Sequence, residues 1–192
     1  MCKIKISLAR MYYPVKVLGP GSRVGIWLNG CNQNCDGCIS PEMQRYDVSK
    51  EVSIDDVEKM INRIQSPIDG FTISGGEPFF KPVALNALVN MLSRYSDDIL
   101  IFSGFTLEEL KKRNDVDIES VLRNCAVLID GPFVKELQGI HGLRGSSNQK
   151  IWIFKHSEKY AGIDTKKRSL QNVVFGNAVL TIGIPERSAS ID

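Results

Sequence analysis

The residues best suited to chemistry are three cysteines that lie within eight positions of one another. Residues 31–38 read CNQNCDGC, which is a C-x3-C-x2-C spacing. Thiolates this close together can hold one face of a metal centre, and the intervening Asn and Gly residues supply the N–H donors that coordinated sulfur favours. The spacing therefore predicts that Cys31, Cys35 and Cys38 are metal ligands.

The kind of metal centre depends on whether a fourth protein ligand exists. Structural zinc uses four protein ligands, usually arranged as two pairs. The remaining candidates are not paired at ligand spacing: Cys2, Cys125, His141 and His156. The cysteine run of two-cluster ferredoxins is also absent. Three cysteines without a fourth fit a [4Fe–4S] cluster whose fourth iron is open, which favours catalysis, while structural zinc or chance clustering is the alternative. Cys125 is expected to be a buried, inert thiol.

Composition narrows the class of protein. The chain has 192 residues and an odd number of cysteines, five, without an export signal, which argues against a disulfide framework. Lys and Arg number 24 against 22 Asp and Glu, a net charge of +2, so nothing in the charge favours nucleic acid or an anionic membrane. No apolar run approaches the ~20 residues of a spanning helix. We expect a soluble, cytoplasmic protein.

The elements that must position the cysteines alternate between strands and helices. Apolar runs predict strands at 24–28, 71–74, 99–103, 126–130 and 151–154. Helical periodicity follows Ser53, a predicted N-cap, and recurs from Val83 to Tyr95. Thr106 and Glu109 form a predicted capping box for a helix through Lys112, and a shorter helix is expected at 118–123.

This alternation predicts an α/β fold with a parallel sheet. A closed eight-unit barrel typically needs ~250 residues, so we expect an open, partial (βα) barrel of about five to six parallel strands. Ligands of such sheets bind beyond the carboxyl ends of the strands, where the cysteine run begins. One domain, 1–192, is expected, with a core at 12–155 and a tail, 156–192, that contains a hairpin and has no assigned role.

A second motif closes the strand at 71–74. Residues 74–78 read SGGEP, and two glycines permit positive φ and a close approach of backbone to a ligand. One βα unit after the cysteine run, this turn resembles the GGE turn of the radical S-adenosylmethionine superfamily, which holds the methionine amino group. On that reading, a bulky residue at Gly76 should weaken S-adenosylmethionine binding and leave the cluster intact.

Five further sequence blocks make the resemblance more specific. Together with the cysteine run, they occur in the same order as in one branch of the superfamily. Together they are similar to the anaerobic ribonucleoside-triphosphate reductase activating proteins, and they lie at 12–15, 19–23, 102–110, 130–134 and 144–149. The chain departs from that branch at Ile39, where His or Tyr is common. The role of the loop Arg144–Gln149 is left open.

The resemblance implies the following site. Cys31, Cys35 and Cys38 would ligate three irons, and S-adenosylmethionine would chelate the fourth. Besides Cys38, the cofactor contacts implied are Gly37, Ile39, Gly75, Gly76, Glu77, Ser103, Gly104 and Asp130.

The function implied is that of a radical S-adenosylmethionine activase, an oxidoreductase. It would cleave S-adenosylmethionine reductively and generate a glycyl radical on a large partner, the anaerobic ribonucleotide reductase, with electrons from a donor such as a flavodoxin. The alternative is a radical S-adenosylmethionine enzyme that modifies a small molecule or a peptide. A non-enzymatic electron-transfer or zinc-binding module would not need the glycine turn.

Overall fold

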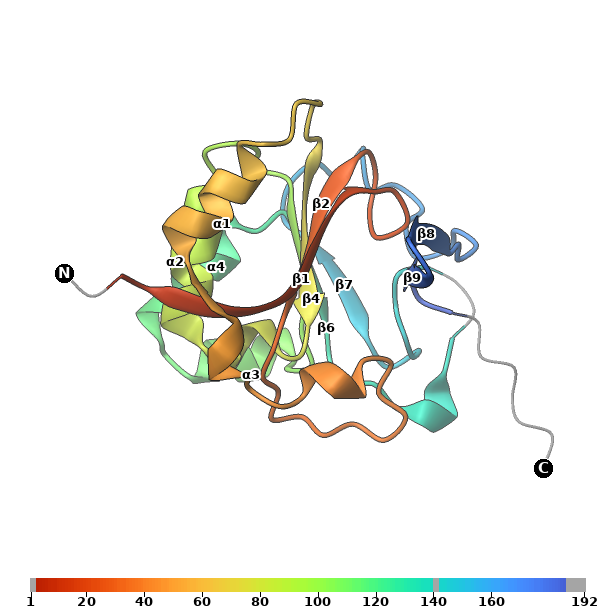
Figure 1. The fold of residues 1–192 in the computed structure, drawn as a ribbon. Helices are drawn as coiled ribbons and strands as arrows, with labels where there is room; N and C mark the ends of the chain where they lie inside the picture. Colours follow the sequence, from red (N-terminus) through yellow and green to blue (C-terminus); the bar gives the residue numbers. More distant parts are fainter. Residues whose placement is uncertain (1–2, 140–141, 186–192) are drawn as a thin grey trace.

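The computed structural model describes residues 3–139 and 142–185 and shows one large open sheet with helices on one face (Figure 1). Within these residues the strands are β1 (Lys5–Val15), β2 (Arg23–Leu28), β3 (Glu51–Ser53), β4 (Gly70–Gly75), β5 (Ile99–Phe102), β6 (Val127–Asp130), β7 (Lys150–Ile153), β8 (Gln171–Phe175) and β9 (Ala178–Ile182). The α-helices are α1 (Ile54–Ile61), α2 (Pro82–Leu92), α3 (Leu107–Lys112) and α4 (Val116–Asn124). No helix of this part of the chain is long and apolar enough to cross a membrane.

The large sheet has seven strands among the described residues, in the order β3-β1-β2-β4-β5-β6-β7. Its four central strands, β2, β4, β5 and β6, are parallel neighbours, whereas β1, β3 and β7 pair antiparallel. The fold is thus mixed α/β and the sheet is open, as expected. The prediction of five to six parallel strands was wrong.

The connections explain the antiparallel edges. A parallel pair needs a crossover of a dozen or more residues, usually helical. Residues 16–22 are too few for one, so β1 runs antiparallel to β2. Residues 131–149 are long enough, but their described part, 131–139 and 142–149, contains only a short 3-10 turn, and β7 returns antiparallel beside β6. β1 had not been expected as a strand at all, because its pairing with β2 contains register shifts that break the period of two.

The helices begin where their capping residues predict. Ser53 Oγ accepts from Asp56 N at 3.2 Å at the start of α1. At α3, Thr106 Oγ1 accepts from Glu109 N at 3.2 Å, and the Glu109 carboxylate accepts from Thr106 N at 2.7 Å, which is a complete capping box. The helix expected up to Tyr95 ends earlier, at Leu92.

The two faces of the sheet are covered differently. On the helix side, alternate strand residues such as Ile26, Ile73 and Ile101 pack with α1, α2 and α4. The opposite, inner face carries Trp27 and Phe102, and the C-terminal segment, which we define as residues 156–185, packs against it. In Figure 1 the helices lie on the left, and the β8–β9 hairpin of that segment lies on the right. The C-terminal segment therefore covers part of the sheet face on which no helix packs.

A buried ion network anchors this segment to the sheet. Arg23 is completely buried and its guanidinium contacts Asp98 Oδ1 at 3.1 Å and Thr72 Oγ1 at 2.7 Å. From the C-terminal segment, Lys159 Nζ lies 2.5 Å from Asp98 Oδ2, and the Tyr160 hydroxyl also donates to Asp98. Burial opposes ionisation of Asp98, but these cations and the hydroxyl outweigh it and lower its pKa. Breaking such a pair would leave a buried charge uncompensated.

Candidate active site

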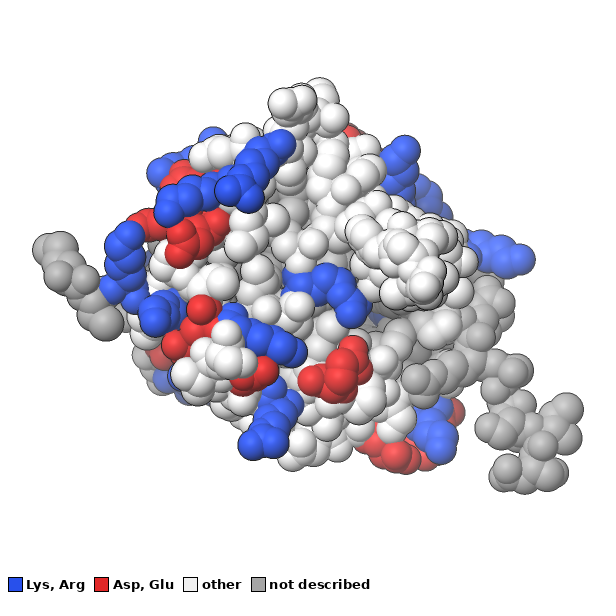
Figure 2. Space-filling view, viewed as in Figure 1, with Lys and Arg blue, Asp and Glu red and all other residues white. Residues whose placement is uncertain are grey.

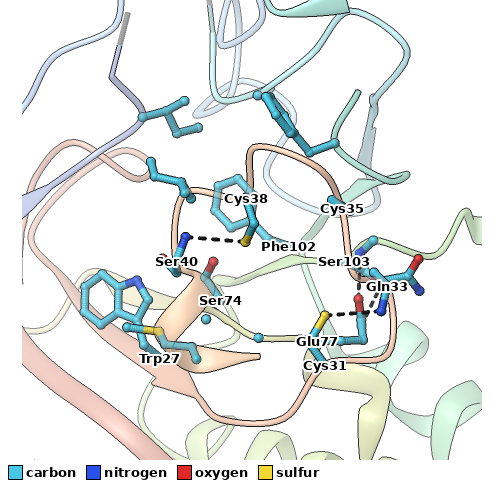
Figure 3. A pocket seen from close by; sticks show the side chains of 18 of the residues that line it. Trp27, Cys31, Gln33, Cys35, Cys38, Ser40, Ser74, Glu77, Phe102 and Ser103 are labelled. Atoms are coloured by element: carbon cyan, nitrogen blue, oxygen red, sulfur yellow. Dashed lines mark hydrogen bonds between the residues drawn. The ribbon is translucent and has the colours of Figure 1, made fainter. Parts of the chain in front are cut away.

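A cavity of about 310 Å³ opens at the carboxyl edge of the parallel strands. The segments that follow β2, β4, β5 and β6 all contribute to its lining, because strands that are parallel end at the same edge. Cys31, Cys35 and Cys38 line it together with the glycine turn after β4. Figure 3 shows the cysteine loop arching over the strand ends that carry Ser74, Glu77 and Ser103.

The cysteine loop turns tightly, and its backbone donates to its own sulfurs. Asn34 and Gly37 have φ of 48° and 67°, in the left-handed region that Gly and Asn tolerate best. Gln33 N donates to Cys31 Sγ and Ser40 N donates to Cys38 Sγ, both at 3.4 Å. Burial raises the pKa of Cys31, and N–H donors from Gln33 and Asn34 oppose that shift. Metal binding must therefore displace a proton from this thiol.

The donor set fits an iron–sulfur cluster better than a single ion. Among residues 3–139 and 142–185, no three His, Cys, Asp or Glu side chains are placed to hold one metal ion. A cubane cluster differs because each thiolate binds a separate iron, so its ligands surround a volume and need not converge on a point. Three thiols facing one cavity, two of them accepting N–H hydrogen bonds, meet that requirement. Of the candidate fourth ligands for structural zinc that the structure describes, Cys125 lies in the core on the helix side and His156 pairs with Asp97; Cys2 and His141 fall outside the described residues.

The glycine turn leaves space for the backbone of neighbouring segments, including the cysteine loop, as well as for a bound ligand. Gly75 has φ of 108°, and a Cβ there would overlap Leu28 N and O of the neighbouring strand. Gly76 does not have positive φ, and a Cβ there would overlap the carbonyl of Gly30, the residue before Cys31. Beside the expected role of Gly76 at the ligand, its missing side chain makes room for the backbone that carries the first cysteine, so a side chain there is expected to disturb the cysteine loop as well.

Glu77 joins the ends of β4 and β5. Its carboxylate accepts from Phe79 N at 2.9 Å, from Ser103 Oγ at 3.0 Å and from Gly104 N at 2.6 Å. The side chain is only 2% exposed. With three of about four acceptor positions used, the carboxylate holds two strand ends in register, which leaves mainly the backbone of this turn to meet a ligand.

The environment of Glu77 predicts a pH effect on stability. Burial raises its pKa from 4.5 to about 7, although the backbone N–H donors of Phe79 and Gly104 and the Ser103 hydroxyl oppose the shift. A carboxyl with a raised folded-state pKa stabilises the fold below its unfolded pKa, and that contribution is lost as pH rises through the folded value. We expect the contribution of Glu77 to the free energy of unfolding of the cluster-free protein to fall by up to about 3 kcal/mol between about pH 4.5 and 7.

Urea unfolding across that range measures this effect. Glu77→Gln, which has no titrating group, should flatten the dependence, while the exposed control Glu136→Gln should keep the wild-type slope. Equal slopes in wild type and Glu77→Gln would show that folding does not raise the pKa of Glu77.

The structure brings most of the expected cofactor contacts to this cavity. Lining it are Gly37, Cys38, Ile39, Gly75, Gly76, Glu77, Ser103 and Gly104. Asp130 does not line it. The Asp130 carboxylate instead accepts from Leu107 N at 2.6 Å, Trp152 Nε1 at 2.8 Å and Lys150 N at 3.3 Å. It therefore fixes α3 and β7 against the end of β6.

Other lining residues were missed from the sequence. Trp27 and Phe102 alternate with helix-facing residues on their strands, and that period of two could have assigned them to the inner face. Residues 181–185 and Arg168, from the C-terminal segment, also line the cavity. The loop Arg144–Gln149, left open above, reaches the site because Gln149 Nε2 donates to Gly131 O at 2.7 Å and its Oε1 accepts from Gly145 N at 2.7 Å.

Comparison with known proteins agrees with this site. A family described as "4Fe-4S single cluster domain" matches residues 17–152, a range that contains the three cysteines and the glycine turn. With the cavity that these residues share, this match defines an iron–sulfur enzyme of the radical S-adenosylmethionine class, whose cofactors are a [4Fe–4S] cluster and S-adenosylmethionine.

Individual relatives show which family within this class the chain belongs to. The chain is 32% identical over 154 residues to the anaerobic ribonucleoside-triphosphate reductase-activating protein of Vibrio cholerae, covering 74% of this chain and 96% of that one. It is 29% identical to the protein of the same name from Enterobacteria phage T4, covering 74% and 91%. Among solved structures, QueE from Escherichia coli overlaps 53% of each chain at 19% identity, with a TM-score of 0.47. The chain belongs to the family of anaerobic ribonucleoside-triphosphate reductase-activating proteins.

Proposed function

We propose that this protein activates an anaerobic ribonucleoside-triphosphate reductase by generating a glycyl radical on it. The observation that carries the proposal is the convergence of three cysteines and the GGE turn on one cavity, in a chain that is similar to activating proteins along most of their length. When bound between these cysteines, a reduced [4Fe–4S] cluster would supply the one electron needed for reductive cleavage of the sulfonium C–S bond of S-adenosylmethionine, which gives methionine and a 5′-deoxyadenosyl radical.

The chain's own residues bind and position the reactants. Cys31, Cys35 and Cys38 would hold three irons as thiolates, and the N–H groups of Gln33 and Ser40, which donate to the sulfurs of Cys31 and Cys38, would stabilise two of these ligands. The backbone of the turn 75–77 receives the methionine amino end of the cofactor. The open sheet would correspond to the partial barrel of the radical S-adenosylmethionine type.

Further lining residues would complete the cofactor site. Ser103 and Gly104 approach the ribose or the methionine, and Gly37 and Ile39 offer backbone to the adenine. Asp130 is not included, because its carboxylate is occupied by α3 and β7.

The walls of the cavity would exclude water and oxygen from the radical. Trp27 and Phe102 cover the sheet side, and Ile182, which is 2% exposed, packs with Val15 and Leu18 on the tail side. Excluding solvent from a reactive intermediate is one of the main tasks of a protein around such a cofactor. The remaining opening would admit a glycine-containing segment of the partner.

A partner-dependent radical tests the proposal. Mixing the reduced, reconstituted protein with S-adenosylmethionine and the candidate reductase without oxygen should give an EPR doublet from the remaining α-hydrogen of a glycyl radical. The doublet should collapse when the partner carries deuterated glycine, and S-adenosylmethionine should be consumed in proportion to the radical formed. Cys35→Ala is the negative control. Release of 5′-deoxyadenosine without a doublet, while a metabolite or peptide changes mass, would instead establish the alternative small-molecule reaction.

Four related proposals complete the description. An electron donor such as a flavodoxin reduces the cluster, the protein works in the cytoplasm, and nucleic acid is not a partner, in line with the net charge of +2. The whole chain, 1–192, forms one domain, which is supported by the burial of Tyr160, Ile163 and Ile182 of the C-terminal segment against the sheet.

A further inference from the structure

A second cavity, of about 350 Å³, lies between the β1–β2 loop and the C-terminal segment. It shares Leu143, Arg168 and Ile184 with the cluster cavity, so the two adjoin. Its volume is in the lower range of small-molecule sites in proteins. None of the chemistry proposed above uses it.

The lining of this second cavity is strongly cationic. Five cationic residues and no carboxylate contribute to it, although the whole chain has a net charge of only +2: Lys16, Lys159, Lys166, Lys167 and Arg168. Cations gathered in a hollow with no lining acid create a positive potential that favours a multiply charged anion. Figure 2 shows Lys and Arg side chains along the upper right margin, where Figure 1 draws the β1–β2 loop and the C-terminal segment.

Three of these lysines are available for a ligand. Lys16, Lys166 and Lys167 are exposed, and none forms an ion pair with a carboxylate in the part of the chain that the structure describes. Lys159 is already paired with Asp98. Arg168 donates to the carbonyl oxygens of Arg144, Gly145 and Pro185, so it shapes the wall between the two cavities.

The nearby acids are engaged or lie outside the lining. Asp69 accepts from Ser22 N at 2.7 Å, and Asp98 is held by Arg23, Lys159 and Tyr160. Asp164 packs its backbone near Gly142 and is not part of the lining. These acids therefore do not occupy the three available lysines.

The β1–β2 loop adds backbone donors. Gly19 and Gly21 line the cavity with φ of 128° and 78°, and their N–H groups donate to no acceptor among the described residues. Glycines with positive φ can turn peptide N–H groups toward an anion. Because Pro20 between them has no N–H, Gly19 and Gly21 supply the two donors of this turn. A Cβ at Gly21 would lie 2.6 Å from Asp69 Cβ, so a side chain there would push the loop out of place.

We propose that this cavity binds a small polyphosphate anion, a di- or triphosphate group, through Lys16, Lys166 and Lys167 and the Gly19–Gly21 backbone. The concave shape and the combination of lysines with peptide donors favour such a group over the acidic surface of a protein, which would require a broad, flat patch. The proposal is independent of the radical chemistry, because it uses none of the residues that hold the cluster.

Calorimetric titration of the reconstituted protein with inorganic tripolyphosphate tests the proposal. We expect saturable binding that weakens as salt rises, and about tenfold or greater loss of affinity in Lys16→Ala/Lys166→Ala/Lys167→Ala. The matched control Lys111→Ala/Lys112→Ala/Lys135→Ala removes the same charge elsewhere and should bind within about twofold of wild type. Replacing the first three lysines by arginine should retain binding. Because all six are exposed, melting temperatures should change little, which separates lost binding from lost folding.

Titration with other anions shows which kind of molecule supplies the negatively charged group. A nucleoside triphosphate that binds more tightly than tripolyphosphate would assign the site to a nucleotide, and equal binding would assign it to the polyphosphate group alone. Equal losses in the two triple variants would reduce the effect to net charge and overturn the proposal. It would also be overturned if an oligoglutamate bound as tightly as tripolyphosphate, since the surface would then serve an acidic polypeptide.

Discussion

Alanine in place of any one of Cys31, Cys35 or Cys38 is expected to abolish the iron–sulfur cluster. Each thiolate would ligate a different iron, so one loss leaves two irons without protein ligands, counting the one that is open by design. Anaerobic reconstitution of the wild type should give about four irons per chain, and each variant well under one. Iron and sulfide analysis, with the visible absorption of the cluster, measures this directly.

The chain offers a matched control in Cys125. Its side chain is completely buried on the helix side of the sheet, its Sγ donates to Leu122 O at 3.5 Å, and burial raises its pKa to about 12. A thiol so placed does not reach the cavity and does not ionise near neutral pH, so Cys125→Ser should keep the cluster. Cys2→Ser, outside the described residues, should keep it as well. Iron that survives in Cys35→Ala, or that disappears in Cys125→Ser, would contradict the ligand assignment.

The second large effect is expected at the glycine turn. In Gly76→Ala the new methyl group would overlap the carbonyl oxygens of Gly30 and Met43. Backbone atoms have no rotamer to change, so either the turn or the cysteine loop must move. We expect a loss of about 2–4 kcal/mol in the free energy of unfolding, and a cluster content far below the wild type. Urea unfolding of the cluster-free protein and iron analysis after reconstitution give the two readouts.

Gly75 allows steric overlap to be separated from backbone strain. Its φ of 108° is close to the 102° of Gly131, but a Cβ at Gly75 would overlap Leu28 N and O, whereas at Gly131 the nearest atom is 3.7 Å away. Gly131→Ala should therefore show only the strain of positive φ, about 1–2 kcal/mol, and Gly75→Ala considerably more. If both variants lost the same stability, close approach to β2 would not be the reason for glycine at 75. A Gly76→Ala protein with full iron and unchanged stability would return that residue to a role in cofactor binding alone.

The burial of Arg23 could not be predicted from the motif in which it lies. The block at 19–23 is part of the resemblance to activating proteins, yet nothing local indicates that its arginine is buried. In the structure, Arg23 Nη2 donates to Phe71 O and to Asp98 O, 48 and 75 positions away. Gly19 is required beside it, because a Cβ there would lie 2.8 Å from Arg23 Cδ. The motif thus joins the start of β2 to the network that also anchors the tail.

The features that can be predicted from the sequence alone are those that depend on neighbours a few residues apart. The spacing of Cys31, Cys35 and Cys38, the caps at Ser53 and Thr106, and the apolar runs of the central strands are local properties. The caps and the apolar runs predicted the helix starts and the parallel centre correctly, and the cysteine spacing keeps these three residues as the predicted ligands. Because parallel strands end at one edge, they also predicted that the cysteines and the glycine turn would meet.

Features that depend on distant partners could not be predicted from the sequence and are visible only in the folded chain. The direction of β7 depends on whether a helix forms between it and β6, and the position of the tail depends on contacts such as Gln171 Nε2 to Pro14 O at 2.7 Å, 157 residues apart. Asp130 does not line the cavity, because its carboxylate accepts hydrogen bonds from Leu107 N and Trp152 Nε1. No periodicity or spacing encodes such pairings, since their energies arise only when the chain has brought both groups out of water and into contact.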